Sequence, residues 1–259
     1  MNREEKQVWL IRAMQAEMPR YAQYPIPQNA DDQWRLLRGL FNVRPPRPAS
    51  PDFLAVQGEL LREITAEKGM IEWKTLQPCH SDPDLYIWQG DITTLRADAI
   101  VNAANSVLLG CFRPNHGCID NIIHTMAGVE LRLKCAELME VQGHEEATGT
   151  AKITPAYNLP CKYVIHTVGP IVEGALTREH CRLLNSCYRS CLEIAEANDC
   201  ESIAFCCIST GVFAFPQRDA AEIAVQTVKE WKREKGSGIK VIFNVFKDED
   251  LAIYKRLLP

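Results

Sequence analysis

The sequence predicts an α/β protein: a three-layer α/β/α sandwich with a mixed, mostly parallel sheet, preceded by an N-terminal helical extension. From about residue 71 onward, apolar runs of strand length alternate with segments of helical periodicity. Several of these runs are continuously apolar, as in strands that helices cover on both faces. The first 70 residues show helical periodicity alone. We therefore divide the chain into an extension, residues 1–70, and a main domain, residues 71–259.

The extension shows three helical stretches, separated by the PIPQN turn and the RPPRPA break. Ser50 and Pro51 open the third helix as cap and first-turn proline, and Gly69 suits its end. No cluster of titratable residues is visible here. We expect a helical layer packed on the main domain; the alternative is that one helix forms a wall of the binding cleft or docks a protein partner.

In the main domain we expect strands and helices to alternate. The strands are Ile71–Gln77, Leu85–Gln89, Ala97–Ala103, Lys152–Tyr157, Tyr163–Thr167, Ile203–Ile208 and Lys240–Val245. The helices are 118–141, 177–198, 216–234 and 248–258. Ligands of such sheets bind beyond the carboxyl ends of the strands. Because the loops 90–94, 105–118 and 209–215 each follow a predicted strand, we expect them to gather on one rim.

The bulk composition excludes several classes of function. A formal net charge of −4 and the lack of a lysine- or arginine-rich face argue against a nucleic-acid partner. No apolar run is long enough for a membrane span, and the first residues do not resemble a signal peptide, so we expect a cytoplasmic protein. There is no glycine-rich dinucleotide fingerprint and no Walker-type loop.

Eleven cysteines is a high count, and in such a chain reduced thiols or metal ligands are expected rather than a disulfide framework. Cys187 and Cys191 share one face of a helical stretch, and Cys206 and Cys207 lie in an apolar run, so we interpret these four as core residues. The cysteines of the loop 105–118 differ, because their neighbours are polar residues, glycine and proline.

That loop presents Cys111, His116 and Cys118, which are zinc ligands by type. Eight residues can wrap one tetrahedral ion, and three protein ligands leave a fourth position for water or substrate, as in catalytic zinc sites. Two alternatives stay open. The cysteines can be free beside a solvent-exposed histidine, or His80 can complete a structural site.

Each of two further loops can be interpreted either as a ligand-binding segment or as a purely structural one. Asp91 follows an apolar strand and can accept a hydrogen bond from an exocyclic amine, or it can simply cap a short helix. The segment 209–216 joins a buried strand to a helix, and its exposed amides suit a diphosphate. Phe213 and Phe215 can form a hydrophobic wall there, or they can point into the core.

Together these motifs resemble the macrodomain family, whose fold binds ADP-ribose. The resemblance covers roughly residues 72–259, with the motifs in family order. They are Gly90–Thr93, Asp98–Asn105, Ile119–His124, Lys162–Pro170 and Ser209–Gly211. The chain departs from the MacroD-type pattern where a glycine run is replaced by the loop Gly110–Cys118. In this the chain resembles a zinc-containing subgroup, whose relatives look like hydrolases that remove mono-ADP-ribose from proteins.

The resemblance implies a role for several residues. Asp91 and the amide of Ile92 should bind the adenine end, bordered by Asn244, Phe246 or Lys247. The diphosphate should lie on the backbone of Ser209, Thr210, Gly211, Val212 and Phe213. Asn105 should contact the distal ribose, beside the zinc loop, and Asp120 matches the catalytically important aspartate of the MacroD-type pattern.

We therefore expect a zinc-dependent hydrolase that acts on mono-ADP-ribosylated protein and cleaves aspartate or glutamate esters. The subgroup's bacterial members are associated with an ADP-ribosylating sirtuin and a lipoyl-carrier protein, which makes that carrier a candidate substrate. In our hypothesis one zinc ion is the electrophile, while Asp120 orients the ribose or acts as the base. The alternatives are a reader module that binds ADP-ribose without hydrolysis and a deacetylase of O-acetyl-ADP-ribose.

Overall fold

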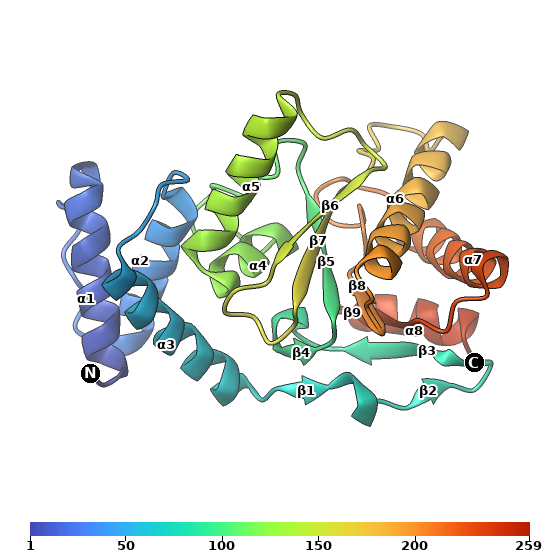
Figure 1. Cartoon of the computed structure of the whole chain (residues 1–259), viewed down its shortest axis with the longest axis horizontal. Helices are drawn as coiled ribbons and strands as arrows, with labels where there is room; N and C mark the ends of the chain where they lie inside the picture. Colours follow the sequence, from blue (N-terminus) through green and yellow to red (C-terminus); the bar gives the residue numbers. More distant parts are fainter.

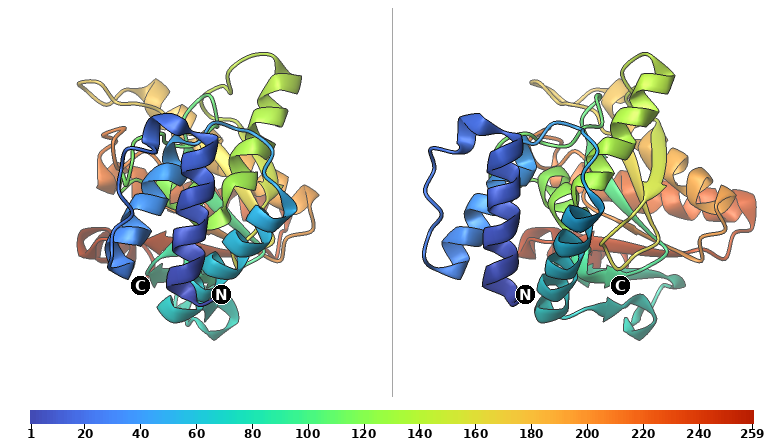
Figure 2. Two further views of the ribbon diagram at one scale, coloured as in Figure 1. Left: turned by 90° about the vertical axis from the view of Figure 1, so that its left-hand side faces the viewer. Right: turned by 60° about the vertical axis from the view of Figure 1, so that its left-hand side comes forward.

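The computed structural model describes all 259 residues, and the chain begins with three helices. They are α1 (Arg3–Glu17), α2 (Ala30–Val43) and α3 (Pro51–Lys68), with a 3-10 turn, η1 (Pro19–Tyr21), after α1. Asn2, Asn29 and Ser50 cap them by accepting hydrogen bonds from first-turn amides. The three helices lie side by side as an outer layer at one end of the molecule (Figure 2).

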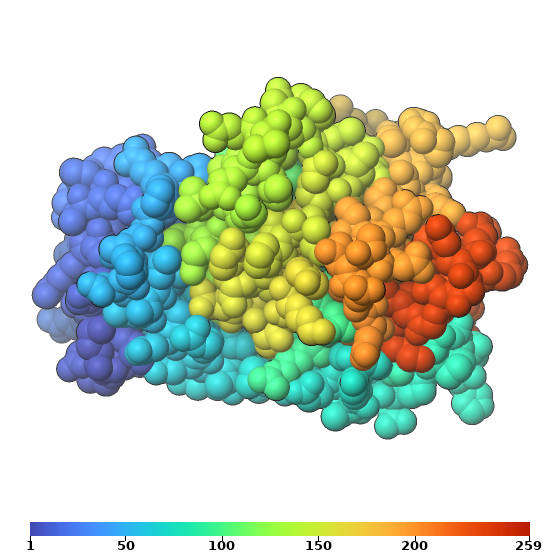
Figure 3. All heavy atoms as spheres, viewed as in Figure 1, coloured from blue at the N-terminus to red at the C-terminus, as the bar shows by residue number.

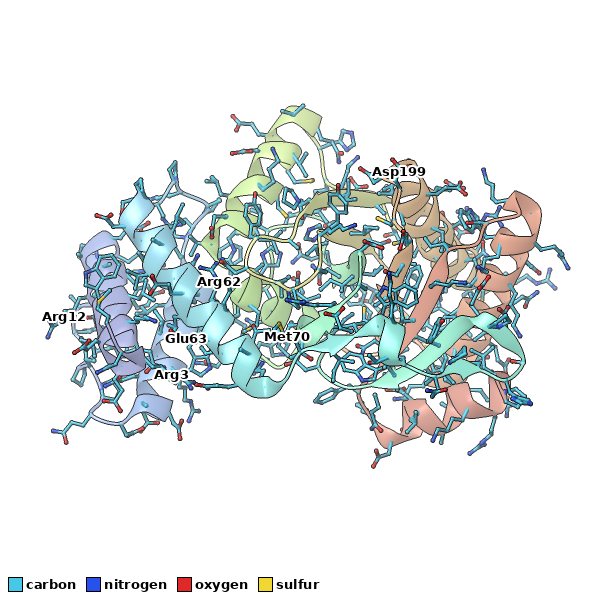
Figure 4. All side chains as sticks on the ribbon, turned by 60° about the horizontal axis from the view of Figure 1, so that its bottom comes forward. Arg3, Arg12, Arg62, Glu63, Met70 and Asp199 are labelled. Carbon is cyan, nitrogen blue, oxygen red and sulfur yellow. The ribbon has the colours of Figure 1, made fainter.

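The helical layer is tied together and to the main body through α3. Arg3 of α1 pairs with Glu67 of α3, while Arg62 of α3 donates to Asn158 of the main body at 3.0 Å (Figure 4 labels both arginines). Buried apolar residues of all three helices belong to the same hydrophobic core as the sheet. In the space-filling view the layer therefore continues into the rest of the surface without a break (Figure 3).

A seven-stranded mixed sheet forms the centre, in the order β2-β3-β9-β8-β5-β7-β6. Its strands are β2 (Pro78–Cys79), β3 (Asp82–Gln89), β5 (Ala99–Ala104), β6 (Ala151–Pro155), β7 (Tyr163–Val168), β8 (Ser202–Phe205) and β9 (Lys240–Val245). The five inner strands are parallel, and the edge strands β2 and β6 are antiparallel to their neighbours. A separate parallel pair joins β1 (Ile71–Glu72) to β4 (Leu95–Arg96).

Helices cover both faces of this sheet, which confirms the predicted three-layer α/β/α fold. They are α4 (Ile119–Ala127), α5 (Val129–Gln142), α6 (Arg178–Ala197), α7 (Gln217–Lys235) and α8 (Asp248–Leu257). In Figure 1 α4 and α5 lie on the left of the central strands, and α6 and α7 lie on the right. The extension adds a further layer outside the sandwich, in which α2 and α3 pack against α4.

Several predicted elements end earlier than expected, among them the strands expected over 152–157 and 203–208, which end at Pro155 and Phe205. The strand expected over 71–77 ends after Glu72, where the 3-10 turn η2 (Trp73–Thr75) begins. The helix expected over 118–141 breaks at Gly128, whose φ is +95°. Glycine adopts this conformation readily and other residues do not, which explains the break; a Cβ there would also lie 2.6 Å from the side-chain nitrogen of Gln57 on α3.

The cysteines predicted to be structural are packed in the interior. Cys187, Cys191 and Cys206 are buried and Cys207 is half-buried, and all eleven cysteines are free thiols. None of the helices has the length and apolarity that a membrane crossing requires.

Candidate active site

The three loops expected to form the site follow parallel strands. β3, β9, β8 and β5 run in the same direction, so their carboxyl ends meet at one edge of the sheet. The loop after β3 contains η3 (Ile92–Thr94), the loop after β5 leads to α4, and the loop after β8 leads to α7. The topology thus brings them to one rim, as predicted.

The donor atoms of Cys111, His116 and Cys118 converge in the loop between β5 and α4. All lie within 4.8 Å of one another, and the side chains are half-buried. Cys111 Sγ is 3.6 Å from His116 Nδ1. Ordinary zinc bonds at a tetrahedral angle would separate a sulfur and a nitrogen ligand by about 3.6 Å. The three residues therefore fit a tetrahedral ion with one position left over; His80 follows the edge strand β2 and is not among the convergent donors.

Cys118 occupies the N-cap position of α4, where the helix dipole favours a thiolate. Burial nevertheless raises the pKa of its thiol to about 11, and the neighbouring Cys111 adds to the shift. A coordinated divalent cation reverses this balance, because its charge deprotonates a coordinating thiol. The free thiol is therefore a poor nucleophile, and the donor set is one that could hold a metal ion.

Asp120 lies at the start of α4 and faces the end of β5. Its side chain is buried, and its Oδ1 accepts a hydrogen bond from Asn102 Nδ2 at 2.8 Å. Asn105 Nδ2 lies 3.4 Å from Asp120 Oδ2 and 3.2 Å from the carbonyl of Gly110. Burial raises the pKa of Asp120 to about 6, although Asn102 and the more distant Arg132 oppose the shift.

The amide oxygen of Asn105 has no partner. Asn105 Oδ1 is buried and accepts no hydrogen bond within the protein, and the same holds for Asn102 Oδ1. A buried acceptor without a donor is costly, so a bound hydroxyl group would satisfy a need of the fold. The distal ribose of ADP-ribose carries such hydroxyl groups, and Asn105 is the residue expected to contact it.

Two buried histidines lie behind Asp120. His124 Nε2 is 3.6 Å from Asp120 Oδ1, too far for a hydrogen bond. Burial, aided by His166 and Arg132, holds the pKa of His124 well below 6.5, so the contact is not an ion pair. His166, on β7, has a pKa of about 4 because of burial, and its Nδ1 lies 3.2 Å from Asn102 Nδ2. Both imidazoles are neutral near pH 7.

Asn102 and His166 are site residues that our reading of the sequence missed. Both fall inside predicted strands, where we interpreted the surrounding runs as apolar core. Both are polar side chains inside otherwise apolar strands, near the carboxyl ends that lead into the site loops. A buried polar residue at such a position is costly unless it has a partner, and this signal could have revealed them.

Asp91 lies after β3 with both side-chain oxygens engaged. Oδ1 accepts hydrogen bonds from the amide and hydroxyl of Thr93, at 3.0 and 2.6 Å. Oδ2 accepts one from Lys68 Nζ at 2.8 Å, and Lys68 is the last residue of α3. Burial favours the neutral acid, but the bonds from Lys68 and Thr93 outweigh it and lower the pKa of Asp91. The neighbouring amide of Ile92 donates to no protein acceptor.

The loop after β8 is folded back on itself by Phe215, whose amide donates to the carbonyl of Ser209 at 3.0 Å. Ser209 adopts a left-handed conformation with φ +64°, and its buried hydroxyl has no partner. The Thr210 amide makes only a 3.4 Å contact inside the loop, whereas those of Gly211, Val212 and Phe213 donate to no protein acceptor. These three amides are therefore available to an anion.

Of the two aromatic residues in this loop, one points into the core and the other remains available for a hydrophobic wall. Phe215 is 2 % exposed and belongs to the core, while Phe213 is half-buried and its carbonyl accepts a bond from Val172. At the other end of the rim, Asn244 donates to the carbonyl of Gly90 at 3.0 Å and Phe246 is exposed. Asn244 therefore supports the Asp91 loop from behind.

Comparison with known proteins agrees with this fold. The Macro domain family model matches residues 101–224. A protein of Treponema medium named protein-ADP-ribose hydrolase is 54% identical over 260 residues, covering 100% of both chains. The chain belongs to the macrodomain family.

Two further macrodomain comparisons bear on ligand and context. A crystal structure of a Trypanosoma brucei macrodomain in complex with ADP-ribose is 30% identical, with a TM-score of 0.67, covering 82% of this chain and 92% of that one. A Fusarium oxysporum f. sp. cubense protein is named probable bifunctional ADP-ribose hydrolase/ADP-ribosyltransferase. It is 43% identical over 241 residues, which are 86% of this macrodomain chain but 40% of the fungal protein.

Proposed function

We propose that this macrodomain is a zinc-dependent hydrolase that removes mono-ADP-ribose from modified protein side chains. The observation that carries the proposal is the convergence of three metal-type donors on the same short segment as Asn105 and Asp120. A reader module needs only a pocket, whereas this arrangement adds an acid–base group and an open metal position. The full-length similarity to a protein named protein-ADP-ribose hydrolase supports the same conclusion.

In the proposed complex ADP-ribose lies along the rim. Asp91 accepts a hydrogen bond from the adenine amine, and the free amide of Ile92 donates to a ring nitrogen. The diphosphate binds the free amides of Gly211, Val212 and Phe213, which supply fixed partial positive charge without a lysine or arginine. The distal ribose then points toward Asn105 and the metal loop.

Zinc suits the donor set, because two thiolates and one imidazole are its usual ligands and leave one position open. When bound by Cys111, His116 and Cys118, it would supply a Lewis acid for the reaction. The remaining chemistry belongs to the chain. Asn105 Oδ1 accepts from a ribose hydroxyl and fixes the sugar, and Asp120 orients that sugar or takes a proton from the attacking water.

The protein substrate is the further part of the proposal. We infer that the bond broken joins the anomeric carbon of the distal ribose to the carboxylate oxygen of an aspartate or glutamate side chain. Asp120 would take a proton from the attacking water, and a bound zinc ion would supply Lewis-acid chemistry. The fungal relative named for both a hydrolase and an ADP-ribosyltransferase supports pairing with a transferase, for which we propose a sirtuin-type enzyme. A lipoyl-carrier protein is the proposed modified partner.

A release assay tests the proposal. A mono-ADP-ribosylated carrier protein with radiolabelled ADP-ribose is mixed with excess enzyme, and free label is measured over a single turnover, with metal content determined on the same sample. We expect release with about one zinc per chain. Label that stays on the carrier while ADP-ribose still binds would make the protein a reader. Release of acetate from O-acetyl-ADP-ribose without action on the carrier would make it a deacetylase.

A further inference from the structure

The metal loop, residues 111–118, makes few hydrogen bonds of its own. Its internal backbone bond runs from the amide of His116 to the carbonyl of Arg113, at 3.2 Å. No helix or strand lies between the end of β5 and the start of α4. A loop of this kind holds three ligands in place only if something outside it fixes its backbone.

The side chain of Asn121, on α4, fixes one arm of the loop. It is fully buried, and its Nδ2 donates to the carbonyls of Cys111 and Arg113 at 3.2 and 3.0 Å. Its Oδ1 accepts a hydrogen bond from Arg38 Nη2 at 2.9 Å. Arg38 comes from α2 in the helical extension, so the bracing of the loop continues outside the main domain.

Arg38 also fixes the second arm. The same Nη2 donates to the carbonyl of His116 at 2.8 Å. Arg38 and Asn121 thus share one hydrogen bond and together hold the backbone of two of the three ligand residues, Cys111 and His116.

Asn42, one turn after Arg38 on α2, holds the tip of the loop. Its Oδ1 accepts a hydrogen bond from the amide of Asn115 at 2.9 Å, and its Nδ2 donates to Thr125 on α4 at 3.0 Å. Asn42 is 1% exposed. Asn115 has φ +54°, a left-handed conformation that must be stabilised by its surroundings.

The glycine between these two side chains shows how closely α2 approaches the loop. A Cβ on Gly39 would lie 3.2 Å from Asn115 Nδ2. Glycine is unfavourable within a helix relative to alanine, and at this position it leaves room for the Asn115 side chain. Arg38, Gly39 and Asn42 therefore present one face of α2 to the metal loop.

We propose that α2 positions the metal centre, with Arg38 and Asn42 as positioning residues. The helical extension is then part of the catalytic unit rather than a layer added to it. This inference rests on the proposed zinc site. Outer-sphere partners of this type typically change metal affinity by about 10- to 100-fold when removed.

The test measures zinc affinity directly, by competition with a chromophoric chelator, in the full-length chain. The variants are Arg38→Met, Arg38→Lys and Asn42→Ala. Arg35→Met is the matched control, because the Arg35 side chain is exposed on the same helix, makes no hydrogen bond or ion pair, and carries the same charge. Cobalt-substituted protein adds a spectroscopic readout of ligand geometry, and ADP-ribose affinity by calorimetry reports the integrity of the pocket.

We expect Arg38→Met and Asn42→Ala to weaken zinc binding by about tenfold or more. Arg38→Lys, which keeps the charge and one donor group, should fall in between. ADP-ribose affinity should stay within about twofold of wild type, and the cobalt–thiolate bands should shift. Arg35→Met should match wild type in every measurement.

Three results would overturn the inference. The first is zinc affinity of Arg38→Met equal to that of Arg35→Met. The second is a parallel loss of zinc and ADP-ribose binding in Arg38→Lys and Asn42→Ala, which would mean general unfolding rather than positioning. The third is a wild-type protein that binds no zinc, a result that also removes the metal from the proposed function and is thereby distinguished from the first two.

Discussion

Replacing Arg132 by methionine should destabilise the whole chain, because this side chain joins the helical extension to the site loop. Arg132 is 5% exposed, and its Nε donates to the carbonyl of Leu109 at 2.7 Å. Its Nη1 donates to carbonyls at the end of α2, those of Phe41, Asn42 and Arg44. Methionine fills a similar volume but leaves all of these acceptors without a donor.

The magnitude follows from these contacts. Each hydrogen bond to a charged group contributes about 1.5–3 kcal/mol, but bonds to one side chain are not additive. We expect a loss of about 3–5 kcal/mol in the free energy of unfolding, as when one partner of a buried ionic group is removed. For a chain of this size that lowers Tm by about 6–20 °C. Arg132→Lys should lose less, although one ammonium cannot reach Leu109 and α2 together.

Thermal unfolding followed by circular dichroism measures this, in one zinc-containing buffer so that metal binding affects all samples alike. The control is Arg182→Met, because Arg182 is 66% exposed and pairs only with Glu179 three residues before it. Such a surface pair contributes less than about 1 kcal/mol. A Tm for Arg132→Met within about 2 °C of this control would refute the assigned role of Arg132.

Three further predictions concern the site itself. Chelation, or Cys118→Ala, should abolish release of ADP-ribose while calorimetry still detects its binding; full turnover without metal would rule zinc out of the chemistry. Asp120→Ala should slow single-turnover release by about 10²–10⁴ if Asp120 is the base, and an unchanged rate would remove it from the mechanism. Lys68→Met should raise the pH at which ADP-ribose binding weakens on acidification. Binding needs the Asp91 carboxylate, so it is complete above the pKa of Asp91 and lost below it. Lys68 helps to lower this pKa, and removing Lys68 should therefore move the loss of binding to higher pH. Calorimetry across a pH series measures the shift, and an unchanged pH dependence would show that Lys68 is irrelevant.

Local signals in the sequence carried much of the fold and of the site. The strand before Asn105, the loop with its three soft donors and the helix beginning near Asp120 are consecutive in the chain, so spacing alone placed them together. The apolar run from Lys240 to Val245 was predicted to the residue. Elements of this kind depend on residues within a few positions of each other.

What the sequence could not provide were contacts between segments far apart in the chain. Arg38 and Asn121 are 83 residues apart, and Arg132 reaches carbonyls about 90 residues earlier. At the break between α4 and α5, the amide of Val129 likewise donates to the side chain of Gln57, 72 residues earlier, a contact that no local pattern records. The helical extension carried no titratable cluster, so nothing in its own sequence connected it with the metal loop.

The two interpretations of Asp91 from the sequence, a helix cap and a ligand for an adenine amine, do not exclude each other. Asp91 caps the turn η3 through Oδ1, yet a carboxylate has about four lone-pair sites, and Thr93 and Lys68 occupy three of them. One acceptor site therefore remains for an adenine amine, and the cap holds the carboxylate in the orientation that a ligand would need. A local structural role thus supplies the preorganisation on which binding depends, because a side chain already fixed by the fold loses little freedom when a ligand arrives.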